Sequence, residues 1–326
     1  MEPKLNSPIQ TQQPRASLAK GYLIAIVGTI LWSTTAILIR YLNDSFAMPP
    51  LVLAFWRDGL VALALAAVFL GHDRTLFQFK KQNWKFLLVY GFVLAIFNAL
   101  WVVSVKLNGA AVSTVLIYSS PAFTAFLERW LFSAKITAVK LAAILLSISG
   151  CVLVSGAYDT ATWGLNPLGI LAGLLTGVLF SGYSMMGKES VHRGINSWTM
   201  LLYSFAVAAV FLLFFNFLTE FPVGLGAIPD AFASFGHQML WLGKSSLGWG
   251  VLFALAVGPT IGGYGLYTLS LRYLSASTAN LIATLEPPLT GIQAYLVLGE
   301  RFTLPQILGS TLTLVGVLLI RLKRDS

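Results

Sequence analysis

Charged residues are scarce in this sequence, and so are the side chains that most metal sites and enzymes need. Lysine, arginine, aspartate and glutamate form 10% of the 326 residues, against about 25% in soluble domains. The one cysteine, Cys151, excludes an intramolecular disulfide. The three histidines, His72, His192 and His237, fall in separate connections, and the chain has no HExxH motif, Cys/His cluster or P-loop. These absences argue against ATP-driven pumping and against an intramembrane enzyme, which stays as the less favoured alternative.

What the sequence has in abundance is apolar runs of bilayer length. Hydrophobic residues form 57% of the chain, and about 20 of them in a helix cross about 30 Å of hydrocarbon. We therefore predict an all-α integral membrane protein with ten transmembrane helices. The runs are 21–42, 49–70, 86–105, 110–132, 136–156, 167–187, 197–219, 247–270, 274–298 and 303–321.

The segments outside these runs are polar or irregular. Residues 1–20 are rich in proline and glutamine, which predicts a disordered tail. The first run is too long for a signal-peptide core and lacks a cleavage pattern, so we interpret it as a retained span. The connection 220–246 is interpreted as an extracytoplasmic loop with Trp241 near the headgroups, a re-entrant segment being the alternative.

The basic residues are unevenly distributed between the two sides of the predicted helices. With the N-terminus in the cytoplasm, 16 of the 21 lysines and arginines lie inside and Arg57 lies within a span. The four on the outside are Arg40, Lys106, Lys244 and Arg301. Because cytoplasmic loops carry the excess of lysine and arginine, we predict a multi-pass protein of the cell (plasma or inner) membrane with both termini cytoplasmic. Charge spread between apolar runs also argues against a nucleic-acid surface.

The chain repeats itself at an offset of 166 residues. "AKITAVKLAAILLSISGCVLV" (134–154) aligns with "ERFTLPQILGSTLTLVGVLLI" (300–320), pairing Gly150 with Gly316. Residues 21–156 and 167–322 thus form two five-helix repeats. Five is an odd number, so the second repeat enters the membrane from the opposite side. Such inverted repeats are typical of secondary transporters, whereas a duplicated channel would need a filter-like loop or a ring of charges that we do not find.

Two predicted spans carry proline at equivalent positions. Pro121 aligns with Pro287, which is followed by Pro288 and preceded by Glu286. The prolines leave without partners the carbonyls of Ile117, Ala283 and Thr284. Paired helix breaks are typical of a transporter's binding site, so we favour cavity lining over a packed kink. A carboxylate beside one break is costly at membrane depth, and it suggests proton coupling or binding of a substrate ammonium, with capping or a fixed ion pair as the alternatives.

The order of spans and motifs resembles the drug/metabolite transporter superfamily, and within it the EamA family. The resembling stretches are "ILWSTTAILIR" (30–40), "LAFWRDGLVALALA" (53–66), "GILAGLLTGVLFSGYSMMGK" (169–188) and "LEPPLTGIQAYLVLGERFTLPQILGSTLTLVGVLL" (285–319). One departure is that Gly299–Glu300 of the second half corresponds to Ser133–Ala134 of the first.

The resemblance implies the drug/metabolite transporter fold and export or exchange of small metabolites, often amino acids or related amphipathic compounds, by alternating access. The expected partners are a small-molecule substrate, protons and the lipid bilayer, with no cofactor, metal or obligatory protein partner. A nucleotide-sugar or other organic-anion antiporter is the alternative on the same fold, although a diphosphate would need more cations than Arg57 alone.

Polar and aromatic residues at mid-span depth are the candidate substrate contacts. Arg57 lies about 12 Å into its helix, where it either binds a substrate carboxylate or makes a structural pair, and we expect the adjacent Asp58, about 100° away, to be an imperfect partner. The full set is Trp32, Ser33, Thr35, Arg57, Asn98, Trp101, Tyr118, Ser119, Tyr183, Tyr264, Tyr267, Asn280 and Glu286. We expect the small residues Gly173, Gly177, Ser181, Gly258 and Gly262 to serve helix packing.

Overall fold

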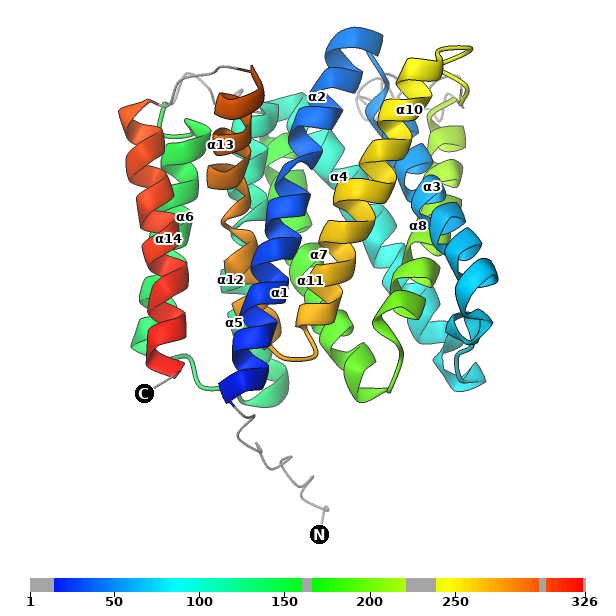
Figure 1. Cartoon of the computed structure of the whole chain (residues 1–326). Helices are drawn as coiled ribbons and strands as arrows, with labels where there is room; N and C mark the ends of the chain where they lie inside the picture. Colours follow the sequence, from blue (N-terminus) through cyan, green and yellow to red (C-terminus); the bar gives the residue numbers. More distant parts are fainter. Residues whose placement is uncertain (1–14, 160–165, 221–238, 299–302, 325–326) are drawn as a thin grey trace.

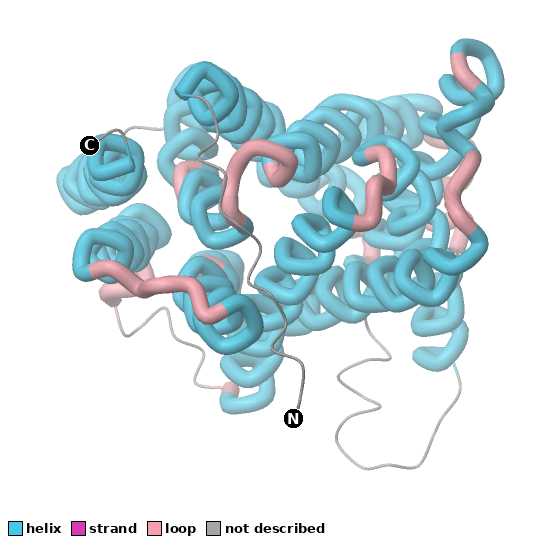
Figure 2. Tube along the Cα trace, turned by 90° about the horizontal axis from the view of Figure 1, so that it is seen from below, coloured by secondary structure: helices cyan, strands magenta, loops and turns pink. Residues whose placement is uncertain are grey.

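The computed structural model is a bundle of helices, and it describes residues 15–159, 166–220, 239–298 and 303–324 (Figure 1). Seven helical runs of this part are long and apolar enough to cross a membrane, and Leu304–Ile320 adds a shorter apolar helix. Figure 2 shows the same part as helices joined by loops, without a strand. The predicted all-α membrane fold is therefore confirmed.

The first half runs from α1 to α6. Its helices are α1 (Arg15–Ser33), α2 (Thr35–Phe46), α3 (Pro50–His72), α4 (Trp84–Ile117), α5 (Ser120–Phe132) and α6 (Ala138–Ser155), with short turns η1 (Arg74–Phe77) and η2 (Lys81–Asn83). The prediction of a disordered tail through residue 20 is wrong from Arg15 onward. Helix α1 begins there, and its Leu18 packs against the apolar cluster that contains Tyr22 and Ile320.

The second half runs from α7 to α14. Its elements are α7 (Pro167–His192), α8 (Ser197–Glu220), α10 (Ser246–Leu255), the π-helix η4 (Ala256–Tyr264), α11 (Gly265–Ser270), α12 (Ala276–Ala283), α13 (Glu286–Leu298) and α14 (Leu304–Arg324). Most of the loop predicted at 220–246 lies outside the described residues. Within the described part, the Trp241 indole donates to the Phe46 carbonyl at 2.8 Å.

Helix α4 contains a reversal of the chain. The hydroxyls of Ser104 and Ser113 are 2.8 Å apart, whereas nine residues of straight helix cover about 13 Å. Both Ser104 and Leu116 also lie against Gly173 of α7. The chain therefore turns back on itself within α4, which accounts for the predicted third span and the start of the fourth.

The fourth and ninth spans are each broken in the middle. The fourth passes from α4, which ends at Ile117, to α5, which begins at Ser120, and the ninth from α12, which ends at Ala283, to α13, which begins at Glu286. Ser120 and Glu286 are separated by the 166-residue offset of the sequence repeat. Because proline cannot continue a hydrogen-bonded helix from the preceding turn, the aligned prolines give both halves the same break.

The contact between α6 and α14 shows the inverted symmetry at the level of atoms. A Cβ added to Gly150 would lie 2.2 Å from the Thr313 hydroxyl and 2.5 Å from the Gly309 carbonyl. One added to Gly316 would lie 2.5 Å from the Ser147 hydroxyl and 2.7 Å from the Ala143 carbonyl. At the repeat offset of 166 residues, Ala143, Ser147 and Gly150 of α6 correspond to Gly309, Thr313 and Gly316 of α14, so the two contacts are equivalent. The two helices therefore approach through glycines in a self-complementary, antiparallel pair.

Several basic residues lie at one end of the bundle. Helix α1 begins and α14 ends at one end (Figure 1), which we call the terminal end, and the other end is called the far end. Basic residues near this end include Lys85, Lys140 and Lys188, which lie close to the ends of α4, α6 and α7, and Arg193 and Arg272, which lie in turns. Outward-facing side chains along the helices are apolar, among them Leu63, Val210 and Phe253. A surface of this kind suits a surrounding lipid bilayer.

Candidate functional site

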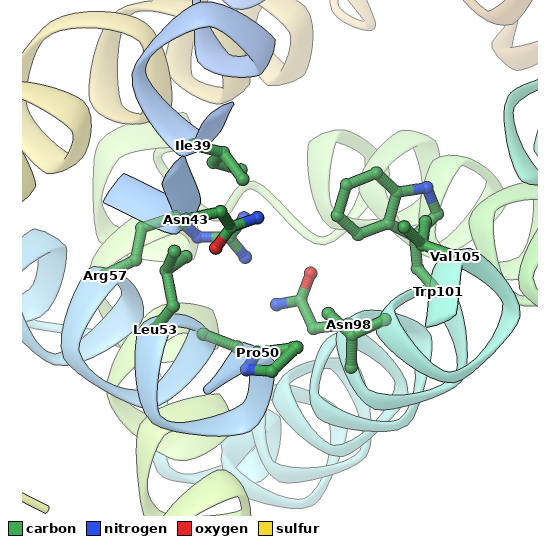
Figure 3. A pocket seen from close by; sticks show the side chains of 10 residues that line it. Ile39, Asn43, Pro50, Leu53, Arg57, Asn98, Trp101 and Val105 are labelled. Carbon is green, nitrogen blue, oxygen red and sulfur yellow. The ribbon is translucent and has the colours of Figure 1, made fainter. Parts of the chain in front are cut away.

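A cavity of about 250 Å³ lies between α2, α3 and α4 (Figure 3). Three of the predicted contacts line it, namely Arg57, Asn98 and Trp101. Its remaining lining residues are Ile39, Asn43, Pro50, Leu53, Ala54, Val102 and Val105. Because Asn43 lies in the last turn of α2 and Pro50 begins α3, the cavity lies toward the far end. The sequence interpretation missed Asn43, which looks like part of a polar loop.

Arg57 is paired with its own neighbour. Its Nε donates to Oδ1 of Asp58 at 2.9 Å, and its Nη2 lies 2.9 Å from the same oxygen. Both residues are buried, and Asp58 has no exposed surface. The expectation that Asp58 would be an imperfect partner is therefore wrong. The Cβ atoms of adjacent helical residues point in different directions, but the long arginine side chain bends back far enough for its guanidinium to reach the Asp58 carboxylate.

Asp58 also holds the second polar residue of the cavity. Its Oδ2 accepts a hydrogen bond from Nδ2 of Asn98 at 2.8 Å. Arg57 and Asn98 come from α3 and α4, so one buried carboxylate joins the two walls of the cavity. In Figure 3 the Asn98 oxygen points toward the open space and its nitrogen toward Arg57. The cavity thus presents a carbonyl acceptor, a guanidinium and the indole of Trp101.

Four predicted aromatic residues form a packed core instead of an open wall. Trp32 lies 4.3 Å from Tyr264 and 5.8 Å from Tyr267, measured between ring centroids, and Tyr183 lies 6.1 Å from Tyr264. All four are buried, and Phe180, which the sequence interpretation missed, contacts Trp32, Tyr183 and Tyr267. In this conformation the cluster closes the middle of the bundle.

Tyr118 joins the two helix breaks. It lies in the break between α4 and α5, and its hydroxyl donates to Oε2 of Glu286, the first residue of α13. None of the ion pairs among the described residues includes Glu286. The buried cation Arg57 is committed to Asp58. The carboxylate therefore has a hydroxyl donor and lies in the first turn of a helix.

The other predicted polar residues near the breaks make local contacts. Ser119 donates to the Leu116 carbonyl at 2.5 Å. Ser33, at the end of α1, donates to the Ile30 carbonyl and accepts from Gln293 of α13 at 2.8 Å. Thr35 begins α2. These residues fix the ends of broken helices and do not line the cavity.

Protein groups cover the carbonyls freed at the breaks. The Thr284 carbonyl accepts from the Cys151 thiol at 3.8 Å, and the Leu116 and Ile117 carbonyls face Gly177 of α7. Ser181 donates to the Ser120 carbonyl at 2.9 Å. Small residues of α7 thus pack against the fourth-span break and Cys151 of α6 covers the ninth-span break, and neither break lines the cavity in this conformation.

A chain of hydrogen bonds crosses the bundle between the aromatic core and the terminal end. Oδ1 of Asn280 accepts from Tyr267 at 2.7 Å and from Ser184 at 3.1 Å, and Nδ2 of Asn280 donates to Thr124 at 2.6 Å. These residues belong to α12, α11, α7 and α5, so elements of both halves are joined. Predicted from sequence as substrate contacts, Tyr267 and Asn280 lie here at the closed side.

Glu128 forms the last layer before the terminal end. Its carboxylate accepts from the Ser277 amide at 3.0 Å and hydroxyl at 2.6 Å, and from Lys140 at 2.8 Å. Glu128 is 7% exposed. It was not predicted from the sequence, where it stands beside Arg129 and resembles a surface charge. We call Glu128, Lys140, Ser277, Asn280 and Thr124 the terminal seal.

The eighth span contains the nine-residue π-helix η4. Pro259 lies within it, and the Thr260 hydroxyl donates to the Leu255 carbonyl five residues earlier at 2.8 Å. A Cβ on Gly262 would meet Leu31 of α1 at 2.8 Å, whereas one on Gly258 would meet nothing within 4 Å. Packing explains Gly262 but not Gly258. Because π-helical turns are frequent at functional sites, η4 is a second element that the sequence interpretation missed.

The repeat offset relates the open side to the closed side. Asn98 corresponds to Tyr264 and Trp101 to Tyr267. The first-half members line the cavity, whereas the second-half members are buried in the core. Among the described residues, no cluster of histidine, cysteine, aspartate and glutamate suits a metal ion. The arrangement suits reversible binding of a small solute in the first half, while the equivalent positions of the second half are packed.

Comparison with known proteins finds transporters that match most of the chain. The model of the EamA-like transporter family matches residues 19–156 and 167–322. The uncharacterized transporter YyaM of Bacillus subtilis is 24% identical over 306 residues, 91% of this chain and 92% of that protein. The uncharacterized inner membrane transporter YicL of Salmonella typhimurium is 23% identical over 316 residues, 94% of this chain and 96% of that protein. A solved crystal structure superposes with a TM-score of 0.74 at 17% identity, covering 94% of this chain and 98% of that one.

Proposed function

We propose, from the premise that the chain belongs to the EamA-like transporter family, that it exports or exchanges amino acids or related amphipathic metabolites by alternating access. The observation that carries the proposal is the unequal state of equivalent positions. Asn98 and Trp101 line an open cavity while Tyr264 and Tyr267 are packed in a core. Exchanging these roles between inverted halves would close the far end and open the terminal end.

The chemistry of the cavity supports an amphipathic solute. Trp101 offers a flat apolar face, Asn98 offers a polar group from the same helix, and Arg57 offers one from α3 on the opposite wall (Figure 3). Arg57 is the one cation among the lining residues, and it is already paired with Asp58. A nucleotide sugar would bring a diphosphate that this single pair cannot neutralise, so the organic-anion antiporter is the weaker proposal.

The direct test is transport by purified protein in liposomes against a panel of amino acids, with and without a pH gradient. We expect one or more members of the panel to cross without chemical change. Failure of the whole panel, or chemical conversion of the solute, would contradict the proposal.

Replacing Trp101 by alanine should weaken substrate binding about tenfold, which corresponds to about 1.4 kcal/mol, because the ring supplies much of the apolar contact of the cavity. The loss of stability, measured as the fall in melting temperature, should be smaller than the loss of binding free energy, because Trp101 is only half-buried. Affinity is measured by titration calorimetry on the solubilised protein. Trp130→Ala is the matched control, because Trp130 is 73% exposed on the outer surface of α5. Equal affinities in both variants would move the binding site away from this cavity.

We also propose that the terminal end faces the cytoplasm. The basic residues gathered there support this orientation. Reporter fusions after residues 160 and 324 should report the outside and the inside respectively. The same side for both fusions would contradict the inverted arrangement of the repeats.

A further inference from the structure

A buried charged residue, Asp58, lies directly behind the wall of the cavity. Asp58 is fully buried and is not among the lining residues. Both of its oxygens are nevertheless used by residues that do line the cavity, Oδ1 by Arg57 and Oδ2 by Asn98. Its position behind the wall makes it a residue that orients the contact groups without touching the solute.

The two hydrogen bonds decide what each contact group presents. Because Nδ2 of Asn98 donates to Asp58, the amide oxygen faces the cavity and accepts (Figure 3). Because Nε of Arg57 donates to Asp58, the guanidinium is held by one edge. Nη2 of Arg57 lies 2.9 Å from the carboxylate but makes no aligned hydrogen bond. A buried donor without an aligned acceptor is costly.

The same pair decides the net charge. The guanidinium and the carboxylate cancel, and the other lining residues carry no formal charge. The cavity therefore offers directed donors and an acceptor without a net electrostatic field. An anion entering it would lose hydration without gaining an uncompensated cation, whereas a solute of zero net charge would lose less.

We propose that Asp58 is a positioning residue that sets the charge selectivity of the cavity: by holding Arg57 and Asn98 it makes the site select zwitterionic or uncharged solutes over organic anions. The proposal rests on the proposed function, because it concerns the same cavity. Removing the Asp58 charge should turn the site into one that prefers anions, without any change to the lining residues.

The experiment compares Asp58→Asn with the parent protein in titration calorimetry. Three probes share one skeleton: phenylalanine is zwitterionic, 3-phenylpropionamide is uncharged and 3-phenylpropionate is an anion. We expect the parent protein to bind the first two at least tenfold more tightly than the anion. In Asp58→Asn, the ratio of anion affinity to phenylalanine affinity should rise at least tenfold. Asp44→Asn is the control, because Asp44 is an exposed acid on α2 whose side chain is 70% accessible, and its ratio should not change.

Further outcomes distinguish failure of this inference from misfolding of the variant and from failure of the proposed function. The double variant Arg57→Gln/Asp58→Asn has no charge at the pair, so it should retain the parent preference against the anion even if the single variant does not fold. An unchanged ratio in Asp58→Asn, or a preference of the double variant for the anion, would overturn the inference. Loss of binding of all probes by one factor would make Asp58 a scaffold residue only. If the parent binds the anion best, this inference fails and transport stands, whereas binding of no probe overturns both.

Discussion

Glutamine in place of Glu128 is expected to open the terminal end of the protein. The carboxylate takes three hydrogen bonds from two elements, the Ser277 amide and hydroxyl on α12 and Lys140 on α6. A glutamine amide keeps only one oxygen, so its NH₂ group would face a donor. Breaking a buried charged pair costs about 3–5 kcal/mol, and the slight exposure of these side chains reduces this to about 2 kcal/mol.

If the terminal seal separates during transport, the lost interactions destabilise only the conformation in which the terminal end is closed. A change of about 2 kcal/mol corresponds to about a 30-fold shift in the equilibrium between closed and open forms. A cysteine at Ala279 of α12, which has no exposed surface in this structure, reports the opening through its rate of reaction with a maleimide. With Cys151 replaced by serine in all variants, we expect Glu128→Gln to raise this rate at least tenfold.

Two controls separate opening of the terminal end from unfolding. Glu189→Gln removes a half-exposed acid of α7 that pairs with Arg193, and it should leave the rate unchanged. A cysteine at Ala208 of α8, buried in a different part of the bundle, should stay unreactive in Glu128→Gln. If the Ala279 site stays protected while Glu128→Gln folds and transports, the barrier at this end lies elsewhere.

The parts of the fold that depend on short segments could be predicted from sequence. Apolar runs of bilayer length are local properties, and the helices follow them closely. The breaks before Pro121 and Pro287 are also local, because a proline removes a hydrogen bond wherever it stands. The repeat offset added long-range information, and the glycine contacts of α6 and α14 follow it residue by residue.

The site depended on contacts that a single segment does not contain. Glu128 and Ser277 are 149 residues apart, and nothing beside Glu128 in the sequence distinguishes it from a surface acid. The Arg57–Asp58 pair differs from the expectation for another reason, since the helical angle describes Cβ directions and not the reach of a long side chain. Depth along the predicted span points to Tyr183, Tyr264 and Tyr267 as substrate contacts, but depth alone does not separate a cavity wall from a packed core.

Glutamine in place of Glu286 is expected to abolish the response of transport to a pH gradient while leaving exchange intact. Glu286 is a half-buried acid at the break of the ninth span, bonded by Tyr118 of the equivalent break. The bond therefore joins elements of the two halves, which alternating access would move relative to each other, and protonation of the carboxylate would weaken it. We propose that Glu286 couples proton movement to the change of access.

The glutamine variant preserves the shape of the side chain and an oxygen that can accept from Tyr118, so the protein should fold. One pH unit across the membrane is worth about 1.4 kcal/mol per coupled proton, or up to about tenfold in substrate accumulation. Liposomes with the parent protein should show this acceleration, whereas Glu286→Gln should show equal exchange with and without the gradient. Tyr118→Phe removes the donor and keeps the carboxylate, so it should shift the pH profile but retain coupling.

If exchange by Glu286→Gln falls at every pH, the carboxylate binds a substrate ammonium instead. An unchanged pH profile would reduce Glu286 to holding the start of α13.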